Sequence, residues 1–304
     1  MEFPLADDIR DKPYLDHHDI LQLNFIRNPG RYLFRRHYRA GLRSHLMEVL
    51  NPEDVAQEKS GVVVDGLRMF PRAIPLKMLR ILRRRFNSLS EAREELRRVK
   101  IVETYLAPDH IAKPAEFLVH YVGPRKWETL LAGLQEYVSG EVLEPWGDLG
   151  RDRLISILAR LGIDEDEDRT VIVARWEDEV RKRAQDFITR LKKMIVETKL
   201  VPDLAGIGNL ILTRTGDIKL VDINNISEVS FDPVIRLDDK GYPVCDRSVI
   251  ALSHLEQELL GIPPQMDDPI YGTFLDPERI EKVKEAEKKF HLSMKPVTPY
   301  LNHS

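Results

Sequence analysis

The stretch VPDLAGIGNLILTRTGDIKLVDINN, residues 201–225, places polar side chains at one end of a predicted β-hairpin. An apolar strand that begins at Asn209 leads to a turn around Gly216, and a second apolar strand returns from the turn to Asp222. Ordinary hairpins keep their charges at the turn and on the wet face. Here Asn209 and Asp222 are expected side by side at the open end, and Asp203, in the preceding loop, can face the same point.

Two acids and an amide at one point have the composition of a phosphoryl-transfer site. Mg²⁺ prefers carboxylate, carbonyl and phosphate oxygens in octahedral geometry, which Asn209 and Asp222 can supply. Such a site also needs a carboxylate that orients or deprotonates the attacking hydroxyl, a role available to Asp203. Taken singly, each residue has a structural alternative, because Asp and Asn at a strand end often form turns or cap helices.

The spacing resembles the catalytic and magnesium-binding loops of the protein-kinase-like superfamily, which share a D-x-x-x-x-N…D arrangement. Thirteen positions separate Asn209 from Asp222, as in that family, with the same strand–turn–strand between them. The interval from Asp203 to Asn209 is one residue longer than the common pattern. Gly206 and Gly208 are expected to absorb the extra residue, because glycine accepts unusual dihedrals.

Two further segments carry the same resemblance. Residues 134–140, LQEYVSG, look like the hinge between the two lobes of that family, with Gln135 as the gatekeeper. The resemblance implies that the adenine edge is read by the backbone of Glu136, Tyr137 and Val138. A helix that starts near Asp246 resembles the buried helix whose leading aspartate braces the catalytic loop.

The small lobe matches this family less closely, since the sequence has no G-x-G-x-x-G. The resemblance requires a basic side chain that contacts the phosphates and a helix acid that pairs with it. Candidates for the base are Arg68, Lys77 and, third, Lys59; candidates for the acid are Glu95, Glu94 and, more weakly, Glu103. Each of these side chains has an alternative as an unpaired surface charge.

Composition limits the class of protein. The chain has 304 residues, of which 42% are hydrophobic and 32% charged, as in globular proteins with a substantial core. The formal net charge of −4 argues against nucleic acid as an obligatory partner. A single cysteine, Cys245, excludes an intramolecular disulfide and suggests a reducing compartment. Without an apolar run of transmembrane length or a recognisable signal peptide, we expect a cytoplasmic protein.

The order of predicted elements indicates an α+β protein with two lobes. Hairpins are predicted at 61–70 and 116–137, and apolar positions at helical spacing occur over 73–86. Helices are predicted over 91–106, 150–162, 176–197 and 277–290, with another from about Asp246. We expect an N-terminal arm over 1–45, a kinase-like N-lobe over 46–138 and a kinase-like, mainly helical C-lobe over 139–304.

Residues 31–43, RYLFRRHYRAGLR, interleave arginines with aromatic residues. One interpretation is a solvated charged surface whose aromatic residues pack inward. The other is a contact with an anionic partner such as phospholipid, lipopolysaccharide or a phosphorylated substrate. The composition leaves both open.

The resemblance implies a phosphotransferase that binds ATP and Mg²⁺ between its lobes, with Asp203 as the catalytic residue and Asn209 and Asp222 as metal ligands. Protein kinases usually carry a lysine two positions after the catalytic aspartate, where this chain has Ala205. We therefore expect a non-protein hydroxyl acceptor, as in bacterial branches that resemble lipopolysaccharide-core kinases or the PhoP regulatory network protein family. The alternative is a pseudokinase that binds nucleotide or a partner without catalysis.

Overall fold

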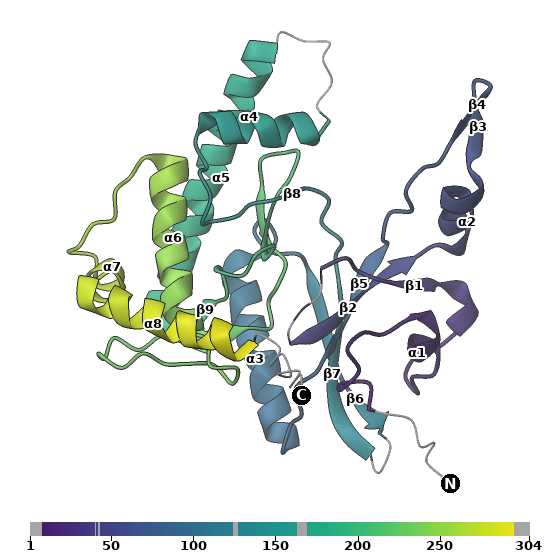
Figure 1. Ribbon diagram of the computed structural model, residues 1–304, viewed down its shortest axis with the longest axis horizontal. Helices are drawn as coiled ribbons and strands as arrows, with labels where there is room; N and C mark the ends of the chain where they lie inside the picture. The colour runs from purple at the N-terminus through teal and green to yellow at the C-terminus, as the bar shows by residue number, and fades with distance from the viewer. Residues whose placement is uncertain (1–7, 40, 42, 124–126, 163–168, 295–304) are drawn as a thin grey trace, which may run out of the picture. The chain divides into compact units, whose positions relative to one another are not determined.

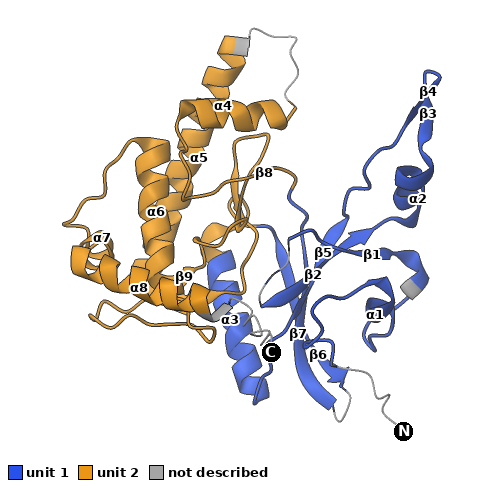
Figure 2. Cartoon of the chain, in the orientation of Figure 1, with its two compact units in different colours: residues 1–103, 112–138 blue, residues 104–111, 139–304 orange. Residues whose placement is uncertain are grey.

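The computed structural model describes residues 8–294 except 40, 42, 124–126 and 163–168, and its fold is mixed α+β (Figure 1). The chain forms two compact units (Figure 2). Unit 1 contains residues 1–103 and 112–138, and unit 2 contains residues 104–111 and 139–304. The short piece 104–111 therefore belongs with the C-terminal half of the chain.

Unit 1 is built on a five-stranded sheet in the order β1-β2-β5-β7-β6, with every neighbouring pair antiparallel. The strands are β1 (Leu33–Arg36), β2 (Ser44–Leu50), β5 (Lys77–Leu82), β6 (Pro114–Val122) and β7 (Trp127–Gln135). The predicted hairpin at 116–137 is thus confirmed as β6 and β7, and residues 124–126 of its turn lie outside the described residues. One face of the sheet carries a buried apolar cluster that includes Phe34, Met47, Val49, Leu79, Ile81 and Leu130.

Short elements and one long helix complete unit 1. They are α1 (His17–Leu21), the 3₁₀ turn η1 (Pro29–Arg31), α2 (Pro52–Ser60), β3 (Val62–Val64), β4 (Leu67–Met69) and α3 (Leu89–Leu106), the last of which continues into residues of unit 2. The predicted hairpin at 61–70 is confirmed as β3 and β4. Asp65 and Gly66 both have positive φ, at 49° and 80°, as a tight two-residue hairpin turn requires.

The structure differs from two expectations for this half of the chain. Residues 73–86, with apolar positions at helical spacing, contain the strand β5, whose residues from Met78 onward are all buried. β5 lies between β2 and β7 and is covered on both faces, so its residues form a continuous apolar run without alternation. Periodicity alone cannot distinguish such a run from a buried helix. The expected N-terminal arm, residues 1–45, is not separate from the sheet: it contributes α1, β1 and the start of β2. Phe34 of this segment packs into the apolar cluster of the sheet.

Unit 2 is mainly helical. Its helices are α4 (Arg151–Arg160), α5 (Arg169–Thr198), α6 (Val244–Leu260), α7 (Pro269–Phe274) and α8 (Pro277–Met294). The apolar face predicted for 176–197 is confirmed in α5, where Val180, Ala184, Phe187, Ile188, Leu191 and Ile195 are all buried. No helix in the described ranges has the length and apolar character needed to cross a membrane.

Five short strands complete unit 2. The strands β11 (Ile218–Leu220), β10 (Leu210–Leu212) and β8 (Glu141–Val142) form one sheet in that order, and β9 (Leu200–Pro202) pairs with β12 (Ile226–Glu228). The hairpin predicted within 201–225 is confirmed as β10 and β11, which pair antiparallel with Leu210 opposite Leu220. Gly216 occupies the turn with φ of +82°, a conformation that glycine adopts without strain.

Candidate functional site in unit 2

The open end of the β10–β11 hairpin brings together two of the predicted site residues. The Val221 N–H donates to the Asn209 carbonyl oxygen at 2.8 Å, which continues the strand pairing beyond Leu210 and Leu220. Asp222 follows directly, so it leaves the hairpin beside the residue where β10 begins. The structure therefore places the backbone of both residues at the open end of the hairpin.

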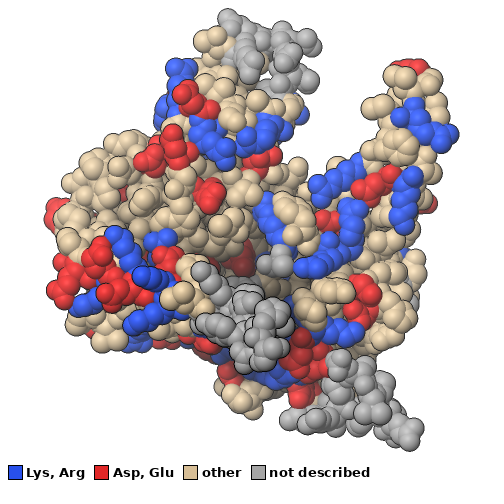
Figure 3. All heavy atoms as spheres, viewed as in Figure 1, with Lys and Arg blue, Asp and Glu red and all other residues tan. Residues whose placement is uncertain are grey.

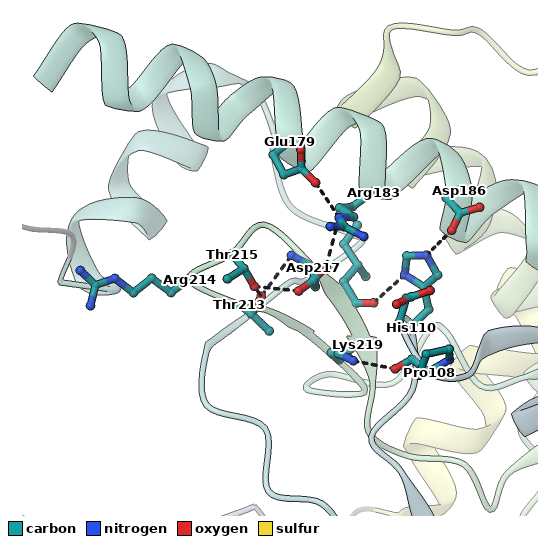
Figure 4. A network of polar contacts seen from close by, with 12 residues as sticks. Pro108, His110, Glu179, Arg183, Asp186, Thr213, Arg214, Thr215, Asp217 and Lys219 are labelled. Atoms are coloured by element: carbon teal, nitrogen blue, oxygen red, sulfur yellow. Dashed lines mark hydrogen bonds and ion pairs between the residues drawn. The ribbon is translucent and has the colours of Figure 1, made fainter.

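A polar network attaches the hairpin to α5 and to residues 108–111 (Figure 4). The imidazole of His110 contacts the Ile218 carbonyl oxygen through Nδ1 at 3.1 Å and the Asp186 carboxylate through Nε2 at 2.9 Å. At the turn, the Arg183 guanidinium pairs with Asp217 at 3.2 Å. These contacts hold β11 along its length, so the positions of the residues at the open end are fixed by neighbouring elements.

The carboxylate of Asp203 is buried and hydrogen-bonded through both oxygens. Oδ1 accepts from the backbone N–H groups of Ala205 at 3.0 Å and Gly206 at 3.1 Å. Oδ2 accepts from the Asn225 amide at 2.9 Å, and the side chain is only 9% exposed. A short turn thus closes around the carboxylate, which keeps Asp203 directed inward in front of the hairpin.

The environment of Asp203 raises the pKa of its carboxyl group to about 6. Burial is the main cause, because it penalises the charged form, and the negative charge of Asp222 is the second. The hydrogen bonds from Asn225, Gly206 and Ala205 act in the opposite direction. The two carboxylates that the sequence assigns to one site therefore lie close enough to interact electrostatically.

Asn209 is joined to the same loop. Its Nδ2 donates to the Asp203 carbonyl oxygen at 2.8 Å, and the side chain is 8% exposed. The backbone is consistent with the expectation that two glycines accommodate the extra residue of this loop, and each glycine has a different role. Gly208 has φ of +85°, whereas a Cβ on Gly206 would lie 2.4 Å from the Asn209 Nδ2, so glycine is needed there for close approach.

Three contacts to this loop come from residues that the sequence reasoning did not assign to it. Trp146 donates its indole N–H to the Ala205 carbonyl oxygen at 2.9 Å. The Ser248 hydroxyl accepts from the Leu204 N–H at 3.2 Å, and Asn225 holds the Asp203 carboxylate. Each comes from a segment outside the loop, so no local spacing pattern could have indicated it.

Asp246 has a different partner from the one the resemblance implies. It is 1% exposed, and its Oδ1 lies 2.6 Å from the Arg279 Nε of α8. In α6, Ser248, two positions further along, accepts a hydrogen bond from the Leu204 N–H in the loop that carries Asp203. Both residues lie on the first turns of α6, so the expected helix contacts the loop, but through a hydroxyl group.

Asn224 provides a test of whether a polar ligand fits this site. Its side chain is 7% exposed, and within the described part of the chain neither its Nδ2 nor its Oδ1 has a hydrogen-bond partner. A buried amide without partners is costly, and bound water, a cation or a phosphoryl oxygen would satisfy it. Its backbone N–H reaches the Asp222 Oδ1 at 3.4 Å, which places Asn224 next to the candidate metal ligand.

The protein donors at this site would form only part of a metal coordination sphere. No group of three or more His, Cys, Asp or Glu side chains in the described ranges is placed to hold a metal ion. The donors present are the carboxylates of Asp203 and Asp222 and the amides of Asn209 and Asn224. Mg²⁺ commonly takes one or two carboxylates and completes its octahedron with water and substrate phosphate oxygens, so this donor set fits such an ion.

The predicted phosphate-contacting bases lie in unit 1, on exposed parts of it. Arg68 is exposed on β4, Lys77 is exposed at the start of β5, and Lys59 is exposed in α2. Arg80 of β5, which the sequence reasoning did not select, is an arginine buried in the sheet, with 3% exposure. Its Nη2 donates at 2.8 Å to the side-chain oxygen of Gln135, the predicted gatekeeper.

The other predicted contacts in unit 1 divide between buried and exposed positions. Glu95 of α3 is 7% exposed and accepts a hydrogen bond from Arg84 at 3.1 Å, whereas Glu94 pairs with Arg97 on the helix surface. Glu136 is exposed, and its backbone N–H donates to the Lys113 carbonyl oxygen at 3.0 Å. The other residues of the predicted hinge, Tyr137 and Val138, are half-buried in irregular backbone after β7.

The site that the structure assembles within unit 2 therefore consists of Asp203 in a closed turn, with Asn209 and Asp222 at the adjoining hairpin end. Asn225 binds the carboxylate, and Asn224 adds a buried amide beside Asp222. In comparisons with protein-family models and with curated proteins, nothing matches this chain.

Proposed function

We propose that the protein is an ATP- and Mg²⁺-dependent phosphotransferase of the protein-kinase-like type, acting on a hydroxyl group of a sugar, a lipopolysaccharide or a small molecule. The observation that carries the proposal is the state of Asp203. Its carboxyl group is buried beside Asp222, and its pKa is raised to about 6. A general base works best when its pKa lies near the working pH, which this environment provides.

The transfer step needs one proton acceptor and one electrophile. The acceptor hydroxyl oxygen forms a bond to the γ-phosphorus of ATP while the bond from that phosphorus to the bridging oxygen of ADP breaks. The hydroxyl proton passes to the Asp203 carboxylate, and ADP leaves with the bonding electron pair. Because Asn225 and two backbone N–H groups fix the carboxylate, its orientation toward an acceptor costs little conformational entropy.

Asp222 and Asn209 would hold Mg²⁺, and Asn224 is a further donor beside them. The ion would supply charge neutralisation for the triphosphate. A bound cation would also relieve the repulsion between Asp203 and Asp222 that raises the pKa of Asp203. The buried amide of Asn224, without partners in the described ranges, supports a polar ligand at this place.

The architecture of the two units supports the family to which the proposal refers. Unit 1 combines a five-stranded antiparallel sheet with one long helix, α3, and unit 2 is mainly helical with the hairpin of the site. The resemblance implies one β-rich and one helical lobe, and the composition of each unit supports the proposal in this respect. A non-protein acceptor is favoured by Ala205, since the lysine of the protein-kinase pattern is replaced there.

Turnover of ATP by the wild type and by Asp203→Asn tests the proposal. The substitution keeps an acceptor oxygen for the Ala205 and Gly206 N–H groups but removes the base. We expect Mg²⁺-dependent ATP hydrolysis or transfer to fall by about 100-fold or more, with nucleotide binding retained. Asp178→Asn is the matched control, because Asp178 is exposed on α5, where it pairs with Arg181, and its substitution should leave turnover unchanged.

The hydrogen bonding of the same carboxylate favours a second function, that of a nucleotide-binding module without catalysis. Asp203 accepts three hydrogen bonds from the chain itself, which is also what a purely structural turn former does. Under this alternative, ATP binds in a Mg²⁺-dependent manner, and neither the wild type nor Asp203→Asn shows turnover with sugar, lipopolysaccharide or small-molecule acceptors. If ATP does not bind at all, both functions are excluded.

A further inference from the structure

One end of the unit 1 sheet carries a group of basic side chains. β1 ends at Arg36, β2 begins at Ser44 and β5 ends next to Arg83. The antiparallel registers, Arg36 with Met47 and Ser44 with Leu82, bring these three strand ends to the same end of the sheet. In Figure 3, Lys and Arg side chains gather over β1, β2 and β5.

The arginine of β1 and the arginine after β5 share one face of the sheet. Strand alternation places Arg36 on the face of Phe34, and Arg83 on the face of Leu79 and Ile81. That face is apolar through the middle of the sheet. It therefore changes abruptly from hydrocarbon to guanidinium groups at this end, where a pocket opens that is lined in part by Tyr14, Arg36, Arg39, His45 and Arg83.

Arg36 and Arg83 have no acidic partner among the described residues that line this pocket. None of the described residues that line it is an aspartate or a glutamate. In the described part of the chain, neither Arg36 nor Arg83 forms an ion pair, and the buried Nε of Arg83 has no hydrogen-bond partner. Burial and the positive charge of Arg36 lower the pKa of Arg83, and the charge of Asp11 has a smaller effect in the opposite direction.

The neighbouring arginine of the same strand, by contrast, is paired with acidic side chains. Arg35, on the opposite face, pairs with the buried Glu48 at 2.7 Å and with Glu58 at 2.6 Å. Arg36 instead lies over the Tyr14 ring, with its guanidinium carbon 5.4 Å from the ring centroid. The two arginines of β1 thus lie on opposite faces of the sheet, Arg35 in ion pairs and Arg36 over an aromatic ring.

Contacts with the remaining walls hold Arg83 and the N-terminal segment in place. Arg83 donates through Nη2 to the Pro13 carbonyl oxygen at 2.8 Å, which holds the N-terminal segment against the strand ends. His45 contacts the Ile9 carbonyl oxygen through Nε2 at 2.8 Å. Burial and the charge of Arg83 lower the pKa of His45 to about 4, so the ring is neutral near pH 7 and adds no charge.

We propose that this pocket binds the phosphoryl group of a phosphate monoester between the guanidinium groups of Arg36 and Arg83. A guanidinium group presents paired N–H donors that match phosphate oxygens. Two positive charges without an ion-pair partner among the described residues correspond to the charge of about −2 that a phosphate monoester carries at neutral pH, whereas a carboxylate would leave one unbalanced. The inference concerns unit 1 alone and does not rest on the proposed phosphotransferase activity.

Calorimetric titration of the full-length chain with inorganic phosphate, at constant ionic strength set with sodium chloride, tests the proposal. We expect saturable binding that is weakened by about tenfold or more in Arg36→Gln and in Arg83→Gln. Arg85→Gln is the matched control, because Arg85 lies two positions from Arg83 but pairs with Asp8 and Asp11, and its affinity should equal that of the wild type. Asp203→Asn should also bind normally, which separates this test from that of the proposed function.

A second titration distinguishes a free phosphate compound from a lipid headgroup. Phosphatidylcholine vesicles with and without phosphatidic acid, a lipid whose headgroup is a phosphate monoester, are mixed with the same variants. Binding of inorganic phosphate alone supports a soluble ligand, and binding only to the phosphatidic acid vesicles, lost in Arg36→Gln, supports a lipid one.

The proposal is overturned if neither probe binds saturably, or if Arg85→Gln weakens binding as much as the pocket variants do. Circular dichroism monitors folding of the half-buried Arg83 variant. If that variant is unfolded, the exposed Arg36 decides the outcome, since its substitution removes no buried contact.

Discussion

Asp203 and Asn225 are hydrogen-bonded to each other twice. The Asp203 N–H donates to the Asn225 carbonyl oxygen at 2.9 Å, and the Asn225 side-chain amide donates to the Asp203 carboxylate at 2.9 Å. The first bond continues the pairing of β9 with β12, in which Pro202 lies opposite Ile226. The position of the candidate catalytic carboxylate is therefore set by strand pairing, and its ionisation is coupled to the stability of unit 2.

The stability of the protein should depend on pH through Asp203. Its folded-state pKa of about 6 lies above the ordinary 3.8, so the folded state holds the proton more tightly than the unfolded state. Its contribution to the free energy of unfolding is present below pH 3.8 and is lost as pH rises through about 6. Between about pH 4 and about pH 7.5 the loss amounts to about 2 kcal/mol.

Urea unfolding of the wild type and of Asp203→Asn at both pH values measures this contribution. The variant has no titrating group at this position, so its stability relative to the wild type should improve by that amount as pH rises. Because all other titrating groups are shared, their effects cancel in the comparison. Parallel pH dependence of the two proteins would show that the Asp203 carboxyl group has an ordinary pKa.

Gly206→Ala should disrupt the loop that carries Asp203. The added Cβ would lie 2.4 Å from the Asn209 Nδ2 and 2.9 Å from its Cγ, so the amide must leave its hydrogen bond to the Asp203 carbonyl oxygen. We expect a loss of about 1–3 kcal/mol in the free energy of unfolding. Gly147→Ala is the control, since its Cβ would meet only the Glu144 carbonyl oxygen at 3.6 Å, and equal losses in both variants would contradict this account.

The ion pair between Asp246 and Arg279 should be a major support of unit 2. The Arg279 side chain lies 2.6 Å from the Asp246 Oδ1 and also donates to the Asp232 carbonyl oxygen at 2.6 Å. Arg279→Gln leaves a buried carboxylate without its counter-charge, which typically costs about 3–5 kcal/mol.

The control for this prediction lies on the same helix. Lys282→Gln removes an exposed pair with Glu278, and such pairs are worth about 0.5 kcal/mol or less. Thermal and urea unfolding should rank the variants accordingly. A loss for Arg279→Gln no greater than that for Lys282→Gln would mean that α8 does not depend on the buried pair.

His110→Leu should loosen the hairpin of the candidate site. The substitution keeps the apolar volume but leaves the Ile218 carbonyl oxygen and the Asp186 carboxylate without the imidazole (Figure 4). We expect a loss of about 1–3 kcal/mol in the free energy of unfolding and faster amide hydrogen exchange in β11. His120→Leu, at an exposed position of β6, should change neither quantity. Unaltered exchange in the His110 variant would show that the His110 network does not hold β11 in place.

Local sequence pattern was sufficient for elements whose signal is contained in a few neighbouring residues. The β10–β11 hairpin follows from two apolar runs and Gly216, and the buried face of α5 follows from apolar residues at the helical period. The same reasoning failed for β5, because a strand that is buried on both faces has no alternation, and its neighbours β2 and β7 are distant in the sequence. Burial by non-local strands is not encoded in local spacing.

For the candidate site, the sequence by itself determined that Asn209 and Asp222 meet at the end of a hairpin, because turn position sets strand register. Only the tertiary structure decided the chemistry of Asp203. Its burial, the bond from Asn225 and the charge of Asp222 come from segments that fold against its loop, and the pKa of a carboxyl group responds to that surrounding dielectric and charge. The same holds for Arg36 and Arg83, whose positive charges meet only because three strand ends converge.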